Sequence, residues 1–272
     1  MGYDLHTHSI FSDGSLKPAQ LVRKARERGL AGIALTDHDC IGGLPEARRE
    51  AQELGFVLVP GVEMTTDYGA HEVHILGYFF NPEDPSLNRK LDQVLRARNE
   101  RARHIIAKLN KHRIPLSWEK VAAKTTSRFV GRSHIFRALE EAGYVNPAQR
   151  RGIFEFYLGI NGIAYVPHQE IDTEEAIGLI NRAGGIAVVA HPGRMNADSL
   201  IEKLVGFGVR GLEVHYPTHT PDMVRHYLKM ARDLGLYVSG GSDYHGAFSQ
   251  TKLGDGQIDS IEALLSAVND SK

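Results

Sequence analysis

The first thirteen residues bring together side chains of the kinds that bind metal ions. His6 and His8 follow a short apolar start and are two residues apart, and Asp13 follows in a loop before Gly14. Residues i and i+2 of a β-strand point to the same face, so a strand here directs both imidazoles to one point. Imidazole is a common ligand of zinc, iron and manganese. Alone, the pair is half of a site, or two polar residues at a strand end.

Similar side chains follow other short apolar runs along the chain. A single histidine in such a place is more often a hydrogen-bonded structural residue than a ligand. A buried cluster of carboxylates and imidazoles, however, would repel itself or leave polar groups unpaired, and a metal ion removes both penalties. The sequence therefore predicts a metal centre whose nine candidate ligands are His6, His8, Asp13, His38, Glu63, His74, His191, Asp243 and His245.

These residues belong to a repeated β/α pattern. Amphipathic runs end in glycine, which is typical of a helix C-terminus, and a short β-rich run follows each of them. Parallel strands with functional residues at their C-terminal ends favour an α/β barrel. An open doubly wound sheet is the alternative, but no glycine-rich dinucleotide or phosphate motif follows the first strand. The predicted strands lie around residues 2–6, 31–36, 56–60, 72–77, 186–190, 211–214 and 236–240.

The β/α pattern breaks between about residues 99 and 166. Helices are predicted at 91–109, at 117–123 with Ser117 as N-cap, and at 133–142. We therefore predict a small α-helical insertion, 99–166, in a barrel formed by 1–98 and 167–272. From Arg89 to Arg137, fourteen Lys and Arg face three acidic residues, an excess of +11 in a chain of net charge −1. This excess predicts an anionic partner, with a solvated arginine-rich helix face as the alternative.

Composition narrows the class of protein. The 272 residues, 42% of them hydrophobic, can form one barrel-sized domain with an insertion. No apolar run approaches the roughly 18 to 20 residues of a membrane span, and no basic-then-apolar leader precedes the first strand. The single Cys40 excludes an intramolecular disulfide and a cysteine-rich zinc site. We expect a cytoplasmic protein without a membrane contact, and no obligate protein partner is evident.

The ordered motifs resemble those of the PHP (polymerase and histidinol phosphatase) family. The resemblance implies a distorted (β/α)7 barrel with up to three divalent ions, which we expect to be Mn²⁺, with Zn²⁺ or Fe²⁺ as alternatives. It implies one ion on His6, His8, Glu63 and Asp243, a second on Glu63, His74 and His191, and a third on Asp13, His38 and His245. The motifs are His6-x-His8 with Ser12-Asp13-Gly14, Thr36-Asp37-His38, Gly61-Val62-Glu63, Ala190-His191-Pro192 and Ser242-Asp243-x-His245.

Such a centre suits phosphoester hydrolysis, because two close ions can activate one water and neutralise phosphate charge. Asp243 is a candidate for orienting that water. His215 could protonate the leaving oxygen or hold phosphate, or it could make a hydrogen bond at the barrel rim. Arg194, three residues after His191, could bind a phosphate with two parallel hydrogen bonds. A second phosphate-binding group, which could instead be solvated surface, is Arg128, Arg132 and His134.

The helical insertion and these arginine segments are similar to one subgroup of the family. That subgroup contains 3′,5′-nucleoside bisphosphate phosphatases and 5′-to-3′ exonucleases of short RNA. It implies removal of the 3′-phosphate from compounds such as 3′-phosphoadenosine 5′-phosphate, and trimming of short 5′-phosphorylated single-stranded RNA. Phe129 or Tyr165 could stack a base, or either could belong to the core.

Two other functions compete with this one. Histidinol-phosphate phosphatase shares the metal motifs, but its small cationic substrate does not account for the +11 excess. A structural or regulatory metal-binding barrel without activity would usually have lost ligands, whereas all nine are present.

Overall fold

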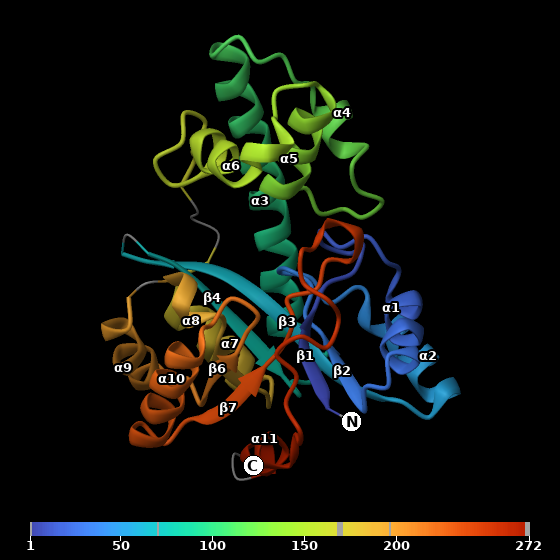
Figure 1. The fold of residues 1–272 in the computed structure, drawn as a ribbon, viewed down its shortest axis with the longest axis vertical. Coiled ribbons are helices and arrows are strands. Elements are labelled where there is room, and N and C mark those ends of the chain that lie inside the picture. The colour runs from blue at the N-terminus through green and yellow to red at the C-terminus, as the bar shows by residue number, and fades with distance from the viewer. Residues whose placement is uncertain (1, 70, 168–170, 196, 270–272) are drawn as a thin grey trace.

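The computed structural model describes residues 2–69, 71–167, 171–195 and 197–269. Its centre is a seven-stranded sheet in which the strands follow one another in chain order. An isolated bridge between Thr7 and Tyr244 links the end of the first strand to the segment after the last, so the sheet is a nearly closed barrel (Figure 1). The strands are β1 (Tyr3–Thr7), β2 (Gly32–Leu35), β3 (Val57–Tyr68), β4 (His71–Tyr78), β5 (Ile186–Val189), β6 (Gly211–His215) and β7 (Tyr237–Gly240).

One strand departs from the expected parallel order. β1 to β3 pair in parallel, as do β5 to β7, but β4 is antiparallel to both of its neighbours. The chain has only two residues between Tyr68 and His71, and Gly69 has a φ of 62°. Such a short connection can join antiparallel strands, whereas a parallel crossover needs a dozen residues or more. The barrel is therefore distorted by one hairpin, and β3 extends to Tyr68 rather than ending near residue 60.

The strands are buried on both faces, which explains their unbroken apolar sequences. Ile33 and Leu35 of β2 pack in the core beneath the outer helices, while Ala34 packs in the barrel's inner core with Leu5 and Leu76. Helix α11, through Leu264, Ala267 and Val268, contributes to that inner core. The helices around the barrel are α1 (Pro18–Glu27), α2 (Leu44–Leu54), α7 (Thr173–Arg182), α8 (Pro192–Met195), α9 (Ser199–Gly206), α10 (Pro221–Asp233) and α11 (Glu262–Asn269).

Helix α3 (Pro85–Lys111) runs from the barrel into a second group of helices (Figure 1). This group, called the helical lobe here, consists of the later turns of α3 and the helices between residues 118 and 158. The first turns of α3 pack into the barrel core, and its later turns join a separate hydrophobic core that extends to Ala164. Because this one helix contributes to both cores, it crosses the proposed boundary at 98/99, and the division at that residue stays a prediction. The rest of the lobe is α4 (Trp118–Ala122), with Ser117 as its N-cap, α5 (Arg132–Glu141), a short 3₁₀ helix (Pro147–Gln149) and α6 (Arg150–Leu158). Within the described ranges, no helix is long and apolar enough to cross a membrane.

Candidate metal centre

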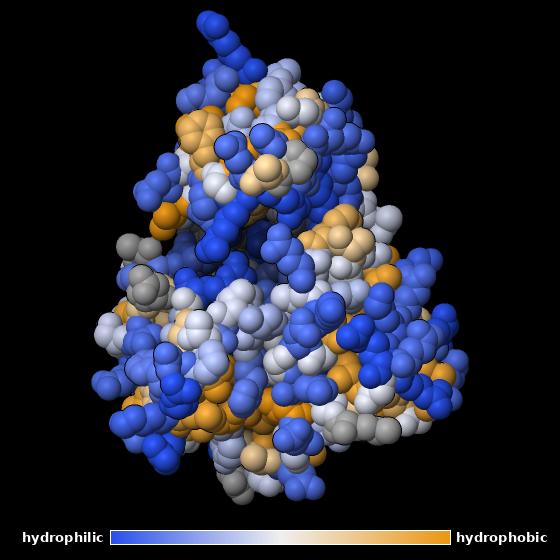
Figure 2. Space-filling view, viewed as in Figure 1, coloured by the Kyte–Doolittle hydropathy of each residue, from blue (hydrophilic) through white to orange (hydrophobic). Residues whose placement is uncertain are grey.

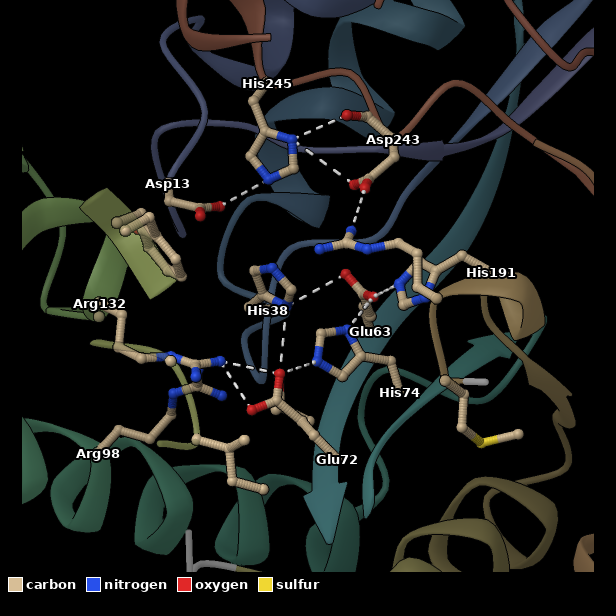
Figure 3. A pocket seen from close by; sticks show the side chains of 18 of the residues that line it. Asp13, His38, Glu63, Glu72, His74, Arg98, Arg132, His191, Asp243 and His245 are labelled. Carbon is tan, nitrogen blue, oxygen red and sulfur yellow. Dashed lines mark hydrogen bonds and ion pairs between the residues drawn. The ribbon is translucent and has the colours of Figure 1, made fainter. Parts of the chain in front are cut away.

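The nine candidate ligands meet at one end of the barrel, between it and the helical lobe. Most of these side chains lie at the ends of parallel strands or in the loops after them, because parallel strands present their C-terminal ends on the same side. Glu63 and His74 lie instead within the hairpin of β3 and β4. Figure 3 shows seven of the nine around one cavity, with Glu63 near its centre. The structure thus brings together residues that are up to 239 positions apart, from His6 to His245.

Glu63 is the common neighbour of the cluster. Its carboxylate oxygens lie 2.7 to 3.2 Å from ring nitrogens of five histidines, namely His6, His8, His38, His74 and His191. Two carboxylate oxygens offer about four lone-pair directions, so they cannot bond well to five rings at once. A carboxylate in this position is suited to bridging ions that those rings share.

The candidate ligand atoms form three sets, and within each set all atoms lie within 4.8 Å of one another. The first set has the four residues expected for one ion. The second adds His8 to the three expected for another, and the third combines Glu63 and His74 with His38. His191 was expected in that third set, and its Nε2 lies 3.0 Å from Glu63 Oε1. The sets are His6, His8, Glu63 and Asp243; His8, Asp13, His38 and His245; and His38, Glu63 and His74.

Unpartnered buried atoms indicate that this cluster fits metal ions. His6 Nε2, His8 Nε2, Asp13 Oδ1 and Glu63 Oε2 are buried and have no hydrogen-bond partner among the described residues. Each such atom costs about 1–3 kcal/mol when left unsatisfied. The two carboxylate oxygens have lone pairs for a cation, and each ring nitrogen has one once a metal ion has replaced its proton. A mixed set of imidazole and carboxylate ligands suits manganese, iron or zinc. The residues present therefore fit divalent ions.

The charges of the cluster favour a cation as well. Burial acts to raise the pKa of Glu63, but the histidines around it, His6 and His74 among them, outweigh it and hold that pKa well below its ordinary value. Burial lowers the pKa of His38 well below its ordinary value, so this ring keeps a lone pair. Burial acts to lower the pKa of His8 too, but Asp243 and Glu63 raise it to about 10. The carboxylates thus favour a positive charge among them, and a divalent ion can replace the proton.

A second carboxylate, Glu213, contacts the ring of one candidate ligand and the backbone of another. It is fully buried in β6, with Oε1 2.9 Å from His6 Nδ1, and its Oε2 accepts the backbone N–H of His191 at 2.6 Å. A hydrogen bond from His6 Nδ1 leaves Nε2 facing the cluster as a lone-pair donor, an arrangement typical of metal-binding histidines. Glu213 was not among the site residues predicted from the sequence, although it lies in the same Glu-Val-His run as His215 and is two positions from it.

His215 lies outside the cluster. It lines a separate cavity with Tyr237, Gln257 and Asp259. The pairing of β6 with β7 shifts register between Glu213 and His215, and such an irregularity breaks the i, i+2 alternation that would have placed both on one face. The structure therefore does not bring His215 to the expected position.

Tyr216, the next residue, contacts the cluster instead. Its hydroxyl donates to Asp243 Oδ2 at 2.9 Å, while Asp243 Oδ1 lies 3.2 Å from His8 Nε2. Arg194 reaches the same place, with Nη1 3.3 Å from the Tyr216 hydroxyl and 3.4 Å from Asp243 Oδ2. Arg194 therefore lies beside the candidate metal ligands, and its role in binding phosphate stays a prediction.

The three residues expected to form a second phosphate-binding group have different surroundings in the structure. Arg132 lines the cavity and makes an ion pair with Glu72 at 2.7 Å, but Arg128 is exposed and absent from the described lining. His134 is buried, and its Nδ1 accepts the N–H of Gly131 at the start of α5. Arg98, which the sequence analysis did not select, lines the cavity and pairs with Asp39.

Protein groups already bind many of the lobe's basic side chains. Arg101 donates to the carbonyl of Val166 at 2.7 Å, Lys108 to that of Tyr165 at 2.5 Å, and Arg137 to that of Asp13. The +11 excess therefore overstates the charge offered to a substrate. The cavity itself, about 460 Å³ and visible as a hydrophilic hollow between barrel and lobe in Figure 2, is lined by three arginines among its described residues: Arg98, Arg132 and Arg194.

Comparison with known proteins agrees with this barrel and cluster. The family model of the PHP domain matches residues 4–146, and the chain belongs to that family. Among curated relatives, the 3′,5′-nucleoside bisphosphate phosphatase of Chromobacterium violaceum is 38% identical over 248 residues, covering 89% of this chain and 86% of that one. The 5′-3′ exoribonuclease Rnm of Escherichia coli is 35% identical over 259 residues, covering 93% and 88%.

Two solved structures share the fold over nearly the whole chain. A protein of Bifidobacterium adolescentis described as a metal-dependent phosphoesterase has a TM-score of 0.88 at 31% identity, and the match covers 98% of this chain and 96% of that one. A Chromobacterium violaceum protein described as an amidohydrolase, solved with sulfate and no metal, also has a TM-score of 0.88, at 36% identity and 98% and 97% coverage. The expected PHP-type barrel is confirmed.

Proposed function

We propose that this protein is a metal-dependent phosphatase of 3′,5′-bisphosphonucleotides. It removes the 3′-phosphate from compounds such as 3′-phosphoadenosine 5′-phosphate and releases the nucleoside 5′-monophosphate and phosphate. The observation that carries the proposal is one cavity in which the nine-residue cluster adjoins arginines from both the barrel and the lobe. A relative named as a 3′,5′-nucleoside bisphosphate phosphatase, similar over most of its length, supports the substrate class.

The metal ions are proposed to be three Mn²⁺, held by the nine candidate ligands in the three groups that the family resemblance implies; eight of these ligands also fall in the sets of close ligand atoms. When bound, they supply positive charge to the phosphate oxygens and a water of lowered pKa. Glu213 keeps His6 Nε2 directed at the cluster. Tyr216 occupies Asp243 Oδ2, which leaves Oδ1 among the imidazoles and fixes the direction of this carboxylate.

Two cationic positions suit a substrate with two phosphates. Arg194 lies beside Asp243 and would bind the phosphate that is removed. Arg132, from α5, lies on the lobe's side of the cavity beside Glu72 and would bind the second phosphate, with Arg98 close to it in Figure 3. A plain monophosphate would use only one of these positions, so the arrangement favours bisphosphates. In this proposal the lobe of residues 99–166 is the substrate-binding part of the chain.

Short 5′-phosphorylated RNA is a second candidate substrate. Releasing a 5′-mononucleotide from the 5′ end of RNA breaks the bond between phosphorus and the 3′-oxygen of the first nucleotide. Removing a 3′-phosphate from a bisphosphonucleotide breaks the same bond, with hydrogen in place of the next nucleoside. One site can therefore serve both reactions, and relatives named as 5′-3′ exoribonucleases favour this second activity.

A phosphate-release assay on manganese-loaded protein tests the proposal. The substrates are 3′-phosphoadenosine 5′-phosphate, adenosine 5′-monophosphate and histidinol phosphate at equal concentration. We expect release from the first at a kcat/KM far above that for the other two. Activity on histidinol phosphate alone would reject the nucleotide assignment while leaving the phosphatase assignment intact.

A further inference from the structure

The cavity has two ends with different chemistry. Its barrel side supplies the candidate metal ligands and Arg194, while α3 and α5 supply Arg98 and Arg132. The part of the lining that comes from α6 and the segment after it is called the far wall here. Phe154, Ile160 and Tyr165 line that wall. Among residues 154–165, the charged side chain that lines the cavity is Glu155. The far wall is thus largely apolar and carries a negative charge.

This wall is unsuited to a phosphate and suited to a planar, uncharged group. A carboxylate such as Glu155 repels phosphate, and apolar side chains offer it no hydrogen bond in exchange for its hydration. A nucleobase, in contrast, gains from covering aromatic and aliphatic surface. Ile160 is 52% exposed although it lines the cavity, so it has apolar surface left to cover.

Contacts with the lobe hold part of the wall in place. Lys108 donates to the carbonyl of Tyr165, and Arg101 donates to the next carbonyl at 2.7 Å. Phe154 packs edge-on against Phe136, with ring centroids 5.2 Å apart. These contacts preform the wall around an exposed Ile160, and a preformed surface costs less ordering entropy on binding.

We propose that Phe154, Ile160 and Tyr165 form the subsite for the base of the nucleotide whose 3′-phosphate is removed. The proposal rests on the proposed function, because that function assigns the arginines to the phosphates and leaves the apolar part of the lining for the base. A volume of about 460 Å³ lies in the ordinary range for small-ligand pockets and suits a single nucleotide. Of the two aromatic residues considered for stacking, Phe129 is 2% exposed and packs between His38 and Arg98, so it has little surface to offer a base.

The test compares substrates with and without a base. The value of kcat/KM is measured for 3′-phosphoadenosine 5′-phosphate and for ribose 3,5-bisphosphate, with wild type, Ile160→Ser and Tyr165→Leu. Phe156→Ser is the matched control, because Phe156 belongs to the same segment, is 58% exposed and is absent from the described lining of the cavity.

We expect each subsite variant to lower kcat/KM for the nucleotide on the order of tenfold, which is the typical effect of losing one stacking or apolar contact. Both should leave the base-free substrate unchanged, and Phe156→Ser should leave both substrates unchanged. No effect of either subsite variant, or an equal loss on both substrates, would overturn the proposal. A defect that appears only with a dinucleotide would also overturn it, because the wall would then bind the second nucleotide.

Failure of the proposed function gives a different result. If wild type hydrolyses neither bisphosphate, calorimetric binding of adenosine 5′-monophosphate and ribose 5-phosphate replaces turnover. The subsite then requires Ile160→Ser to weaken binding of the nucleotide and not that of the sugar phosphate. Equal binding of the nucleotide by variant and wild type would overturn the subsite independently of catalysis.

Discussion

His134 makes the stability of the fold sensitive to acid, and His134→Gln should remove that sensitivity. The ring is 1% exposed, and its Nδ1 accepts the N–H of Gly131 at 3.1 Å in the first turn of α5. Burial lowers the pKa of this ring to about 4 from an ordinary value of 6.5. Glutamine at the same helix position can accept the same N–H and has no charge to gain.

The size of the effect follows from the two pKa values. As the pH falls below 6.5, His134 becomes protonated in the unfolded chain, whereas in the folded protein it stays neutral until the pH approaches about 4. Acid therefore favours unfolding, and this contribution to stability is intact above pH 6.5 and is lost as the pH falls toward 4. The full loss is about 3 kcal/mol, of which about 2 kcal/mol occurs between pH 7 and pH 5.

Urea unfolding of metal-free protein measures this loss, with the fluorescence of Trp118, the chain's single tryptophan, reporting on the lobe. The other ionisable groups titrate in both proteins, so they cancel when the variant is compared with wild type. From pH 7 to pH 5, wild type should lose about 2 kcal/mol more than His134→Gln. Equal losses would refute this reasoning. A raised KM in the variant, without any change in pH sensitivity, would return His134 to the substrate-binding role first expected.

Three further substitutions test the site, and a fourth, Arg128→Ala, serves as a control. Asp243→Ala should lose bound metal, measured by elemental analysis, together with nearly all turnover; full metal content would exclude Asp243 as a ligand. Glu213→Gln should weaken metal affinity about 10- to 100-fold, because an amide has one acceptor oxygen for the two N–H groups, of His6 Nδ1 and the His191 backbone, that the carboxylate accepts, and unchanged affinity in a chelator titration would contradict that role. Arg194→Ala should keep its metal but lower kcat/KM on the order of 100-fold, while Arg128→Ala, at an exposed position, should match wild type. Metal loss in Arg194→Ala would make its role structural.

Most of the barrel and the candidate ligands could be predicted because their signals are local. Each strand has a β-rich run, and His6 and His8 need only i, i+2 spacing to reach one point. The direction of β4 was missed because β-rich runs do not reveal strand direction. The two-residue connection after Tyr68 did contain that information, since it is too short for a crossover.

The rest of the site depends on irregularities and on packing between distant segments. The register shift in β6 directs Glu213 to the cluster and His215 away from it, and no residue type in this strand predicts such a shift. His134 was expected to contact phosphate; the structure shows its Nδ1 accepting the N–H of Gly131 in the first turn of α5, and the phosphate contact stays a prediction. The basic excess was read as substrate charge, although carbonyls far along the chain, such as that of Val166, accept several of those side chains.

The identity of the nucleotide product tests the central claim most directly. Manganese-loaded protein is incubated with 3′-phosphoadenosine 5′-phosphate, and the products are separated by chromatography. The account predicts adenosine 5′-monophosphate and phosphate in equal amounts, and no product after removal of the metal. Adenosine 3′-monophosphate as the nucleotide product, or undiminished turnover in metal-free protein, would contradict it.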